Sequence, residues 1–376
     1  MDWATHASHL ADSVVRYDSR WHIPLAQVPR HLFVPRWWAG GVKGWELRDG
    51  ASSTEEWMKA AYSDRTLVTR VGPHHADLAE AGAVVTEGLP TSSPTLPSLV
   101  VSMYQHAYVQ EDSEVLVTTG SGYGTALMCR RLGDRRVTSI DIDPHLVAQA
   151  EQRLDAIKQR PRIAVGDITG ALEGTYDRII STVSVRPVPA SWLTALQPGG
   201  RLVTTIAGAG LVLTADKTAH GGAVGRIEPS AAGFMRTRQN EDYDYPDAEL
   251  WRKAEKDDAE EVSICRYPLL YPPDSWEVYS MLALSVPGID YRQETEGDVR
   301  TVLMLHPDGS WARATATEFL GEPIVHQSGP ARLWDELTRV RNRLNREGGL
   351  PVYGARVTIT SDATTTLTRG QWSHTL

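Results

Sequence analysis

Cysteine is scarce in this 376-residue sequence, and long apolar runs are missing altogether. The two cysteines, Cys129 and Cys265, stand far apart and form no ligand or disulfide pattern, which favours a reducing compartment and two inert buried thiols. No apolar run approaches the length that spans a bilayer, and residues 1–10 have neither the basic patch nor the apolar core of a signal peptide. We therefore expect a cytoplasmic protein that has no membrane partner.

Positive charge is also in short supply. The formal net charge is −9 and the isoelectric point is about 5.8, which argues against a nucleic-acid partner. Much of the acidic excess lies in residues 241–261, where ten acids face Arg252, Lys253 and Lys256. This segment is a solvated connector between domains or, alternatively, an acidic rim that attracts a basic peptide.

A metal-binding pattern is missing too. The chain has 12 histidines, but none of them shows the spacing of a ligand set. His74 and His75 are adjacent, so their side chains point to opposite sides of an extended chain and cannot easily share one ion. We expect no metal cofactor.

The most informative feature that is present is a glycine turn within Val115–Ala126. An apolar, strand-like run leads into Gly120-Ser-Gly122-Tyr-Gly124, and a helical pattern follows. Asp141 comes 19 residues after Gly122, at the end of a second strand-like run. Glycines let the backbone approach a ligand closely, and an acid at the tip of the next strand can accept both hydroxyls of a ribose. The spacing differs from the dinucleotide fingerprint, so the pattern predicts a nucleoside-type cofactor of another kind.

Three further segments continue the alternation of strand and helix. Residues 163–167 predict a third strand ending in Gly166-Asp167, residues 176–182 a fourth, and residues 196–203 a Pro-Gly-Gly turn into a fifth. Asp167 is well placed to accept from an adenine amino group. The order of these features resembles that of the S-adenosylmethionine-dependent methyltransferases, which implies S-adenosylmethionine as cofactor and S-adenosylhomocysteine as product.

The remaining sequence predicts further elements on either side of this sheet. We expect a helix within residues 1–20 and a loop or short hairpin over 37–45. The later predictions are strands over 276–284 and 299–305, a turn over 306–311, a helix over 330–346 and a closing strand over 352–360. Trp276 and Trp311 are expected in packing or, alternatively, in a peptide groove.

The expected fold class is therefore α/β, a Rossmann-like class I methyltransferase sheet with an N-terminal family-specific segment and an appended C-terminal α+β module. The methyltransferase domain covers residues 1–240, with a substrate-side segment over 1–112 and the cofactor-binding sheet over 113–240. Residues 241–376 form the accessory domain, for which we expect a role in recognising a substrate peptide.

A more specific resemblance rests on three motifs. Residues 28–35, Val-Pro-Arg-His-Leu-Phe-Val-Pro, resemble the opening motif of protein L-isoaspartyl O-methyltransferases, and Ala61-Tyr-Ser-Asp64 resembles their next motif. A Thr-x-Ser-x-Pro motif precedes the glycine loop in that family, and an ungapped count places Pro97 on its proline and Thr95 on its serine. The resemblance covers roughly residues 10–215.

This chain departs from the family in its Thr95, in a shorter glycine loop, in an insertion over residues 36–60 and in its C-terminal 130 or so residues. A shifted alignment would place Ser92 or Ser93 where the family has its serine. Such long homologues resemble actinobacterial enzymes that esterify an aspartate of a ribosomally made lanthipeptide, graspetide or lasso peptide. The ester then closes to a succinimide, also called an aspartimide.

The resemblance and the loop positions together give a set of candidate residues. The cofactor-binding candidates are Thr119, Gly120, Ser121, Gly122, Tyr123, Asp141, Ile142, Gly166, Asp167, Ile168 and Thr182. The candidates for orienting the reacting carboxylate are Thr95, Ser92 and Ser93, and those for the substrate side are Tyr62, Asp64, Val183 and Ser184. A hydroxyl before Leu99 can instead cap a helix, and Asp143 is expected to cap the helix that begins at Pro144.

Three functions remain open at this point. The first is a peptide-specific aspartate O-methyltransferase, which needs no general base because a carboxylate is already ionised at pH 7. The second is repair of isoaspartate in damaged proteins, and the third is a non-catalytic protein that kept the fold.

Overall fold

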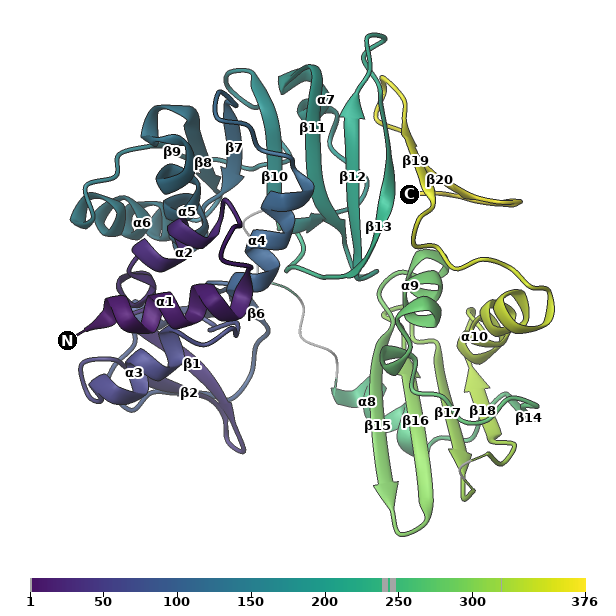
Figure 1. Cartoon of the computed structure of the whole chain (residues 1–376). Helices are drawn as coiled ribbons and strands as arrows, with labels where there is room; N and C mark the ends of the chain where they lie inside the picture. The colour runs from purple at the N-terminus through teal and green to yellow at the C-terminus, as the bar shows by residue number, and fades with distance from the viewer. Residues whose placement is uncertain (1, 239–242, 244–247, 319) are drawn as a thin grey trace.

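The computed structural model describes residues 2–238, 243, 248–318 and 320–376. A large sheet runs through the middle of the molecule, with the N-terminal helices next to its β7–β9 half and a second sheet next to its β11–β13 half (Figure 1). None of the helices in these described ranges has both the length and the hydropathy of a bilayer-spanning segment.

The large sheet has ten strands in the order β21-β20-β19-β13-β12-β11-β10-β7-β8-β9. The five parallel strands are β7 (Val115–Thr118), β8 (Val137–Asp141), β9 (Arg162–Val165), β10 (Tyr176–Val185) and β11 (Leu196–Ile206). The other five are antiparallel, namely β12 (Leu211–Lys217), β13 (Ala223–Ala231), β19 (Arg356–Ile359), β20 (Thr365–Arg369) and β21 (Trp372–Thr375). The parallel α/β sheet expected from the sequence is thereby confirmed.

Helices connect the parallel strands as a doubly wound sheet requires. They are α5 (Tyr123–Leu132), α6 (Pro144–Ala156) and α7 (Ala190–Ala195), while α4 (Pro97–His106) precedes β7 and contacts β10 and β11. Helix α6 begins where expected, because Asp143 accepts from the backbone N–H of His145 at 3.0 Å and of Leu146 at 3.4 Å. Pro144 fits the first helical turn, where its missing N–H costs nothing.

The N-terminal segment forms two small sheets and a group of short helices. It contains α1 (Trp3–Val14), α2 (His22–Gln27), α3 (Thr54–Ala61), the 3₁₀ helices η1 (Arg30–Phe33) and η2 (Ala76–Leu78), and the strands β1 (Arg36–Gly41), β2 (Gly44–Asp49), β3 (Arg70–Val71), β4 (His74–His75), β5 (Val84–Val85) and β6 (Pro90–Ser92). Strands β1 and β2 pair in antiparallel register, so the hairpin alternative for residues 37–45 is right. Strands β4, β3 and β6 form a three-stranded sheet.

The C-terminal part contains a five-stranded antiparallel sheet, ordered β14-β18-β17-β16-β15. Its elements are α8 (Ala248–Lys256), β14 (Glu261–Ile264), η4 (Pro272–Asp274), α9 (Trp276–Ser285), β15 (Asp290–Glu296), β16 (Val299–Leu305), β17 (Trp311–Ala316), β18 (Ile324–Ser328), α10 (Leu333–Arg341) and its π-helical extension η5 (Asn342–Arg346). The predicted strand over 299–305, turn over 306–311 and helix over 330–346 are confirmed.

The strand expected over residues 276–284 is wrong, because these residues form helix α9. This helix is buried at Val278 and continuously over residues 280–284, so it has no clear apolar face, and a short apolar run cannot be assigned by periodicity alone. Trp311 is buried against α8, as the packing interpretation expects.

The expected boundary at residue 240 also needs correction, because the chain returns to the large sheet at its end. The predicted closing strand exists as β19, but it pairs with β13 rather than with the C-terminal sheet. One apolar core joins both sheets and includes Leu202, Leu213, Leu282 and Trp334. Arg186 of the large sheet also donates to the carbonyl of Ala283 at 3.1 Å. Residues 356–375 therefore extend the large sheet, and the five-stranded sheet packs against it through the shared core.

Candidate active site

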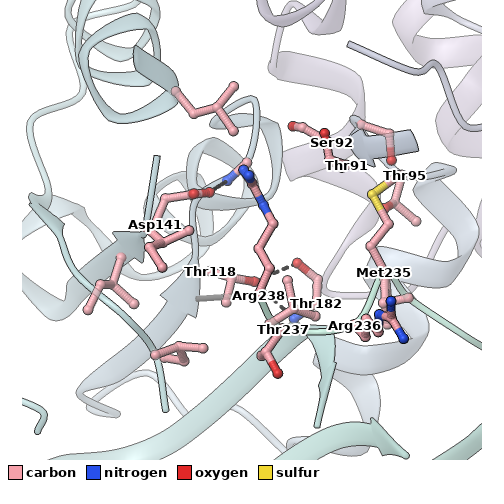
Figure 2. Close-up of a pocket in the computed structure, with 18 of the residues that line it drawn as sticks. Thr91, Ser92, Thr95, Thr118, Asp141, Thr182, Met235, Arg236, Thr237 and Arg238 are labelled. Atoms are coloured by element: carbon pink, nitrogen blue, oxygen red, sulfur yellow. Dashed lines mark hydrogen bonds between the residues drawn. The ribbon is translucent and has the colours of Figure 1, made fainter. Parts of the chain in front are cut away.

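A cavity lies at the carboxyl ends of the parallel strands β7, β8, β9 and β10. Its empty volume is about 1030 Å³ including the open mouth, enough for a nucleoside with an attached amino acid. Segments following those strands form one wall, while residues 91–99 and the strap Gly233–Arg238 form the other (Figure 2). Carboxyl ends of parallel strands are where open α/β sheets bind ligands.

Asp141 stands at the tip of β8 with its carboxylate inside the cavity. One oxygen accepts from the backbone N–H of Gly120 at 2.8 Å and the other from that of Asp143 at 3.0 Å. Burial raises the pKa of Asp141, while these two hydrogen bonds oppose the rise. Each carboxylate oxygen has a further lone pair, so the group fits the two hydroxyls of a ribose.

The two key glycines of the loop serve different purposes. Gly120 lines the cavity with a φ of 51°, a conformation that glycine adopts without strain. Gly122 does not line it. A Cβ on Gly122 would lie 3.1 Å from the Cβ of Ala150 and 3.4 Å from the ring of Phe33, so this glycine permits close packing of α5 on α6.

The wall beyond Asp141 is mostly apolar and suits a flat aromatic base. It consists of Ile140, Ile142, Leu146, Gly166, Asp167 and Ile168. The carboxylate of Asp167 also accepts from the backbone N–H and the hydroxyl of Thr169, each at 2.8 Å. A base amino group would therefore share Asp167 with this turn.

Thr95 and Ser93 line the opposite side of the cavity, on a loop held by the buried Arg30 of the Val-Pro-Arg motif. Arg30 is 0% exposed and donates to backbone carbonyls of two separate segments, residues 61–65 and 94–95. These carbonyls belong to Ala61, Ser63, Arg65, Pro94 and Thr95, at 2.8 to 3.3 Å. The motif thus acts from a distance, because Arg30 fixes the position of Thr95 without lining the cavity.

Two further contacts fix the same loop. Thr66 accepts from the backbone N–H of Leu96 at 3.1 Å, and Asp64 accepts from that of Ser98 at 2.8 Å. Asp64 therefore caps α4 from another segment, so the structure does not place it among the cavity residues, and Thr95 is not the cap. Ser92 also lines the cavity, but its hydroxyl is buried and accepts from Thr69 at 3.2 Å.

Several other sequence candidates lie outside the cavity. The hydroxyl of Tyr62 contacts Nδ1 of His31 at 2.7 Å. Thr119 bonds Ser139 at 2.6 Å. Tyr123 is buried, with the guanidinium of Arg30 5.4 Å from its ring centroid. Ser121 is buried next to it and accepts from the backbone N–H of Tyr123 at 3.4 Å. Thr119, Ser121 and Tyr123 therefore support the glycine loop from within the protein, and none of these four side chains lines the cavity.

Strand β10 contributes Thr182 and Val183 to the cavity but not Ser184. Thr182 and Thr118 join the tips of β10 and β7 through their hydroxyls, 2.6 Å apart. Ser184 is buried, and its hydroxyl contacts that of Thr205 at 2.6 Å. Its backbone instead holds the strap, because Ser184 donates to the carbonyl of Met235 at 2.8 Å and accepts from Thr237 at 2.9 Å.

The strap was missed by the sequence reasoning. It brings Phe234, Met235, Arg236, Thr237 and Arg238 to the cavity, although it lies well beyond the fifth strand expected over residues 196–203. Two arginines two residues apart, directly before the acidic run, were the available signal. Of that acidic run, Glu241, Asp242, Asp244 and Asp247 lie outside the described residues.

An ionic cluster lies behind the cofactor wall, around Asp143. The same carboxylate oxygen lies 3.2 Å from Nε2 of His75, 3.4 Å from Nε of Arg70 and 3.5 Å from Nη2 of Arg238. Burial alone would raise the pKa of Asp143, but His75 and Arg70 outweigh it and hold this pKa well below its usual range. Within the described ranges, no group of three or more His, Cys, Asp or Glu side chains is arranged to hold a metal.

Comparison with known proteins agrees with this geometry. Residues 72–229 match the sequence model of the family described as Protein-L-isoaspartate(D-aspartate) O-methyltransferase. A relative of that name from Azorhizobium caulinodans is 35% identical over 114 residues, which are 29% of this chain and 52% of the relative. Another from Trichlorobacter lovleyi is 32% identical over 146 residues, 36% of this chain and 65% of the relative. The chain thus spans about half to two thirds of these relatives.

Two solved structures are similar to this chain. A protein-L-isoaspartate O-methyltransferase aligns with a TM-score of 0.48 at 17% identity, over 100% of this chain and 99% of that one. A putative enzyme of the same name from Plasmodium falciparum, in complex with S-adenosyl-L-homocysteine, aligns with a TM-score of 0.45 at 13% identity, over 64% and 100%. By sequence, then, residues 72–229 carry the pattern of the protein-L-isoaspartate O-methyltransferase family.

Proposed function

We propose that this protein is an S-adenosylmethionine-dependent carboxyl O-methyltransferase. Its substrate is an aspartate side chain in a ribosomally made, modified peptide, and the resulting ester leads to succinimide and on to isoaspartate. The observation that carries this proposal is the cavity itself. Asp141 stands at one end and Thr95 at the other, in a chain whose residues 72–229 match the isoaspartyl methyltransferase family.

The cofactor end of the cavity has the hydrogen-bond acceptor and the apolar walls that the ligand needs. The Asp141 carboxylate would hold the ribose hydroxyls, and the backbone at Gly120 would lie against the sugar and the methionyl chain. The apolar side chains of Ile142 and Ile168 would enclose the adenine. S-adenosylmethionine supplies a methyl group on a sulfonium cation.

The acceptor end needs to orient a carboxylate rather than to activate it. An aspartyl side chain has a pKa near 4 and is already a nucleophile at pH 7. Its oxygen gains the methyl group and loses its charge as the methyl–sulfur bond breaks, so excluding water favours the step. Thr95 would donate a hydrogen bond to this carboxylate, with Ser93 as the alternative donor, while Leu99 and Met235 exclude water.

The C-terminal residues favour one substrate class over the other. The family match ends at residue 229, yet residues 241–376 add a second sheet and share an apolar core with the first. A second sheet of this size would offer a surface for one particular substrate, whereas repair requires that any damaged chain be accepted. It suits the recognition of one particular precursor peptide in the cytoplasm.

Repair of isoaspartate in damaged proteins is the second candidate, and the relatives named above favour it. The same cavity serves it equally, because an isoaspartyl residue also presents one free carboxylate.

Mass spectrometry distinguishes the two. The protein and S-adenosylmethionine are incubated with a generic isoaspartyl peptide and, separately, with the modified precursor encoded next to its gene. A gain of one methyl followed by loss of methanol, with the precursor only, is the expected result. Turnover of the generic peptide alone would establish repair instead. Calorimetry that detects no S-adenosylmethionine binding would favour a non-catalytic protein.

A further inference from the structure

The strap Gly233–Arg238 carries two arginines whose surroundings differ. Its backbone is fixed on both sides of Arg236, because Met235 accepts from Ser184 and Thr237 donates to Ser184. Arg236 forms an isolated bridge with Ser184 at the end of β10. Arg236 therefore has a defined backbone position at the mouth of the cavity.

Arg238 belongs to the cofactor end. Its guanidinium lies 3.5 Å from Asp143, and Figure 2 shows its side chain extending towards Asp141. Arg238 thus already lies next to a carboxylate of the protein, which it shares with Arg70 and His75.

Arg236 belongs to the acceptor end. Figure 2 shows it with Met235 on the side of the cavity where Thr95 lies. Its side chain is exposed, and within the described part of the chain its guanidinium makes no ion pair. The ring of Tyr243 lies 4.7 Å from the guanidinium carbon and supports it from one side.

An exposed arginine is ordinary on a protein surface, but this one combines three features. It lines the cavity, its backbone is fixed by two hydrogen bonds, and its guanidinium rests on an aromatic ring. A guanidinium fork matches the geometry of a carboxylate and binds it through two parallel hydrogen bonds. The proposed substrate brings such a carboxylate to this end of the cavity.

We propose that Arg236 binds the reacting carboxylate of the substrate and so determines which side chains are accepted. The proposal rests on the proposed function, since it concerns the acceptor of that reaction. Arg236 selects aspartate over its neutral amide counterpart, asparagine. It also releases the product, because methylation turns the bound anion into a neutral ester that no longer attracts the guanidinium.

The test is a binding cycle that needs no turnover. Calorimetry with saturating S-adenosylhomocysteine measures the affinity of two peptide pairs, a ring-closed aspartyl peptide with its asparaginyl twin, and an isoaspartyl hexapeptide with its amide twin. In the unmodified protein the acid of at least one pair should bind about tenfold tighter than its amide or better. Arg236→Gln should bring the two affinities together, and Arg236→Lys should restore part of the preference.

Two variants serve as controls. Arg238→Gln should weaken S-adenosylhomocysteine binding but leave the acid-to-amide ratio unchanged. Asp290→Asn tests a structural role, because Asp290 of β15 is the carboxylate of the C-terminal sheet that feels the charge of Arg236. The acid-to-amide affinity ratio of the Asp290→Asn variant should also stay unchanged.

The outcomes separate the two proposals. A ratio that survives Arg236→Gln, or that Asp290→Asn abolishes equally, overturns the role of Arg236, as does an unmodified protein that shows no preference for acid. A clear preference that depends on Arg236, together with methylation of neither acid, would leave the role of Arg236 standing and remove the proposed function alone.

Discussion

The two ends of the cavity are built in different ways. The cofactor end comes from consecutive strand tips within residues 115–183, where each side chain follows its own strand. The acceptor end comes from residues 91–99 and 233–236, which are far apart in sequence. The buried Arg30 holds the first of these segments, and the backbone of Ser184 holds the second.

This difference determines which substitutions should affect ligand binding and which should affect folding. Local geometry secures the cofactor end, so a change there should affect ligand affinity more than folding. The acceptor end depends on long-range polar contacts, so a change in its supports should disturb the fold of the whole N-terminal segment. The predictions below test this contrast, starting with the largest effect.

Replacing Arg30 should have the largest effect. Arg30→Met leaves several buried carbonyls without a donor, so the free energy of unfolding should fall by about 3 kcal/mol or more. Arg30→Lys should recover little, because one ammonium group cannot reach all of these carbonyls. Urea denaturation followed by tryptophan fluorescence measures both. A loss below about 1 kcal/mol for Arg30→Met would show that the acceptor loop has other supports.

Asp141→Ala should weaken ligand binding much more than it weakens the fold, which is the reverse of the effect expected for Arg30. Losing two charge-assisted hydrogen bonds should weaken S-adenosylhomocysteine binding about 100-fold, while the urea midpoint changes little. Asp155→Ala, which removes an exposed carboxylate on α6, is the matched control and should bind normally. Unchanged affinity in the Asp141 variant would mean that the ribose acid is assigned to the wrong residue.

The same contrast explains how far the sequence could be interpreted. Asp141 could be placed from sequence because strand, glycine turn and acid follow one another within 30 residues. The part played by Arg30 could not, because its partners lie 31 to 65 residues away and nothing local signals them. The positions of Tyr62 and Asp64 outside the cavity could not be foreseen for the same reason, since a sequence motif does not reveal which way its side chains point.

The C-terminal residues show a second limit. Alternating strands such as β16 were predictable from their β-branched and apolar residues, whereas α9 was not, because its apolar run fits either structure. That β19 returns to the large sheet could not be inferred at all. Strand partners across more than 100 residues depend on packing of the assembled core.

Thr95 should have a smaller effect than either of the preceding residues. Thr95→Ala removes one hydrogen bond to the acceptor carboxylate, so kcat/KM for the methylated peptide should fall about tenfold, and Thr95→Ser should retain most of it. Ser93→Ala is the comparison variant. If kcat/KM falls further in Ser93→Ala than in Thr95→Ala, Ser93 carries the key hydroxyl.

The smallest effect should be the contribution of His31 to the pH dependence of stability. Burial lowers the pKa of His31 to about 4, below the ordinary value near 6.5 of the unfolded chain. As the pH falls, the unfolded chain therefore takes up a proton at His31 before the folded chain does. The free energy of unfolding is highest above pH 6.5 and declines as the pH falls towards 4.

Comparing urea midpoints at pH 7 and pH 5 checks this, with His31→Asn as the reference. The unmodified protein should lose about 1 kcal/mol more than the variant between these pH values. Asp143 at the cofactor end stays ionised throughout this range, so its Asn variant should keep the dependence. An equal pH response with and without His31 would place the sensitivity elsewhere.

The most direct test is a crystal structure of the protein with S-adenosylhomocysteine. The account predicts that the ribose lies on the carboxylate of Asp141, the adenine lies between Ile142 and Ile168, and the sulfur points towards Thr95 and Arg236. An empty cavity, or a ligand whose sulfur points away from Thr95, would contradict it.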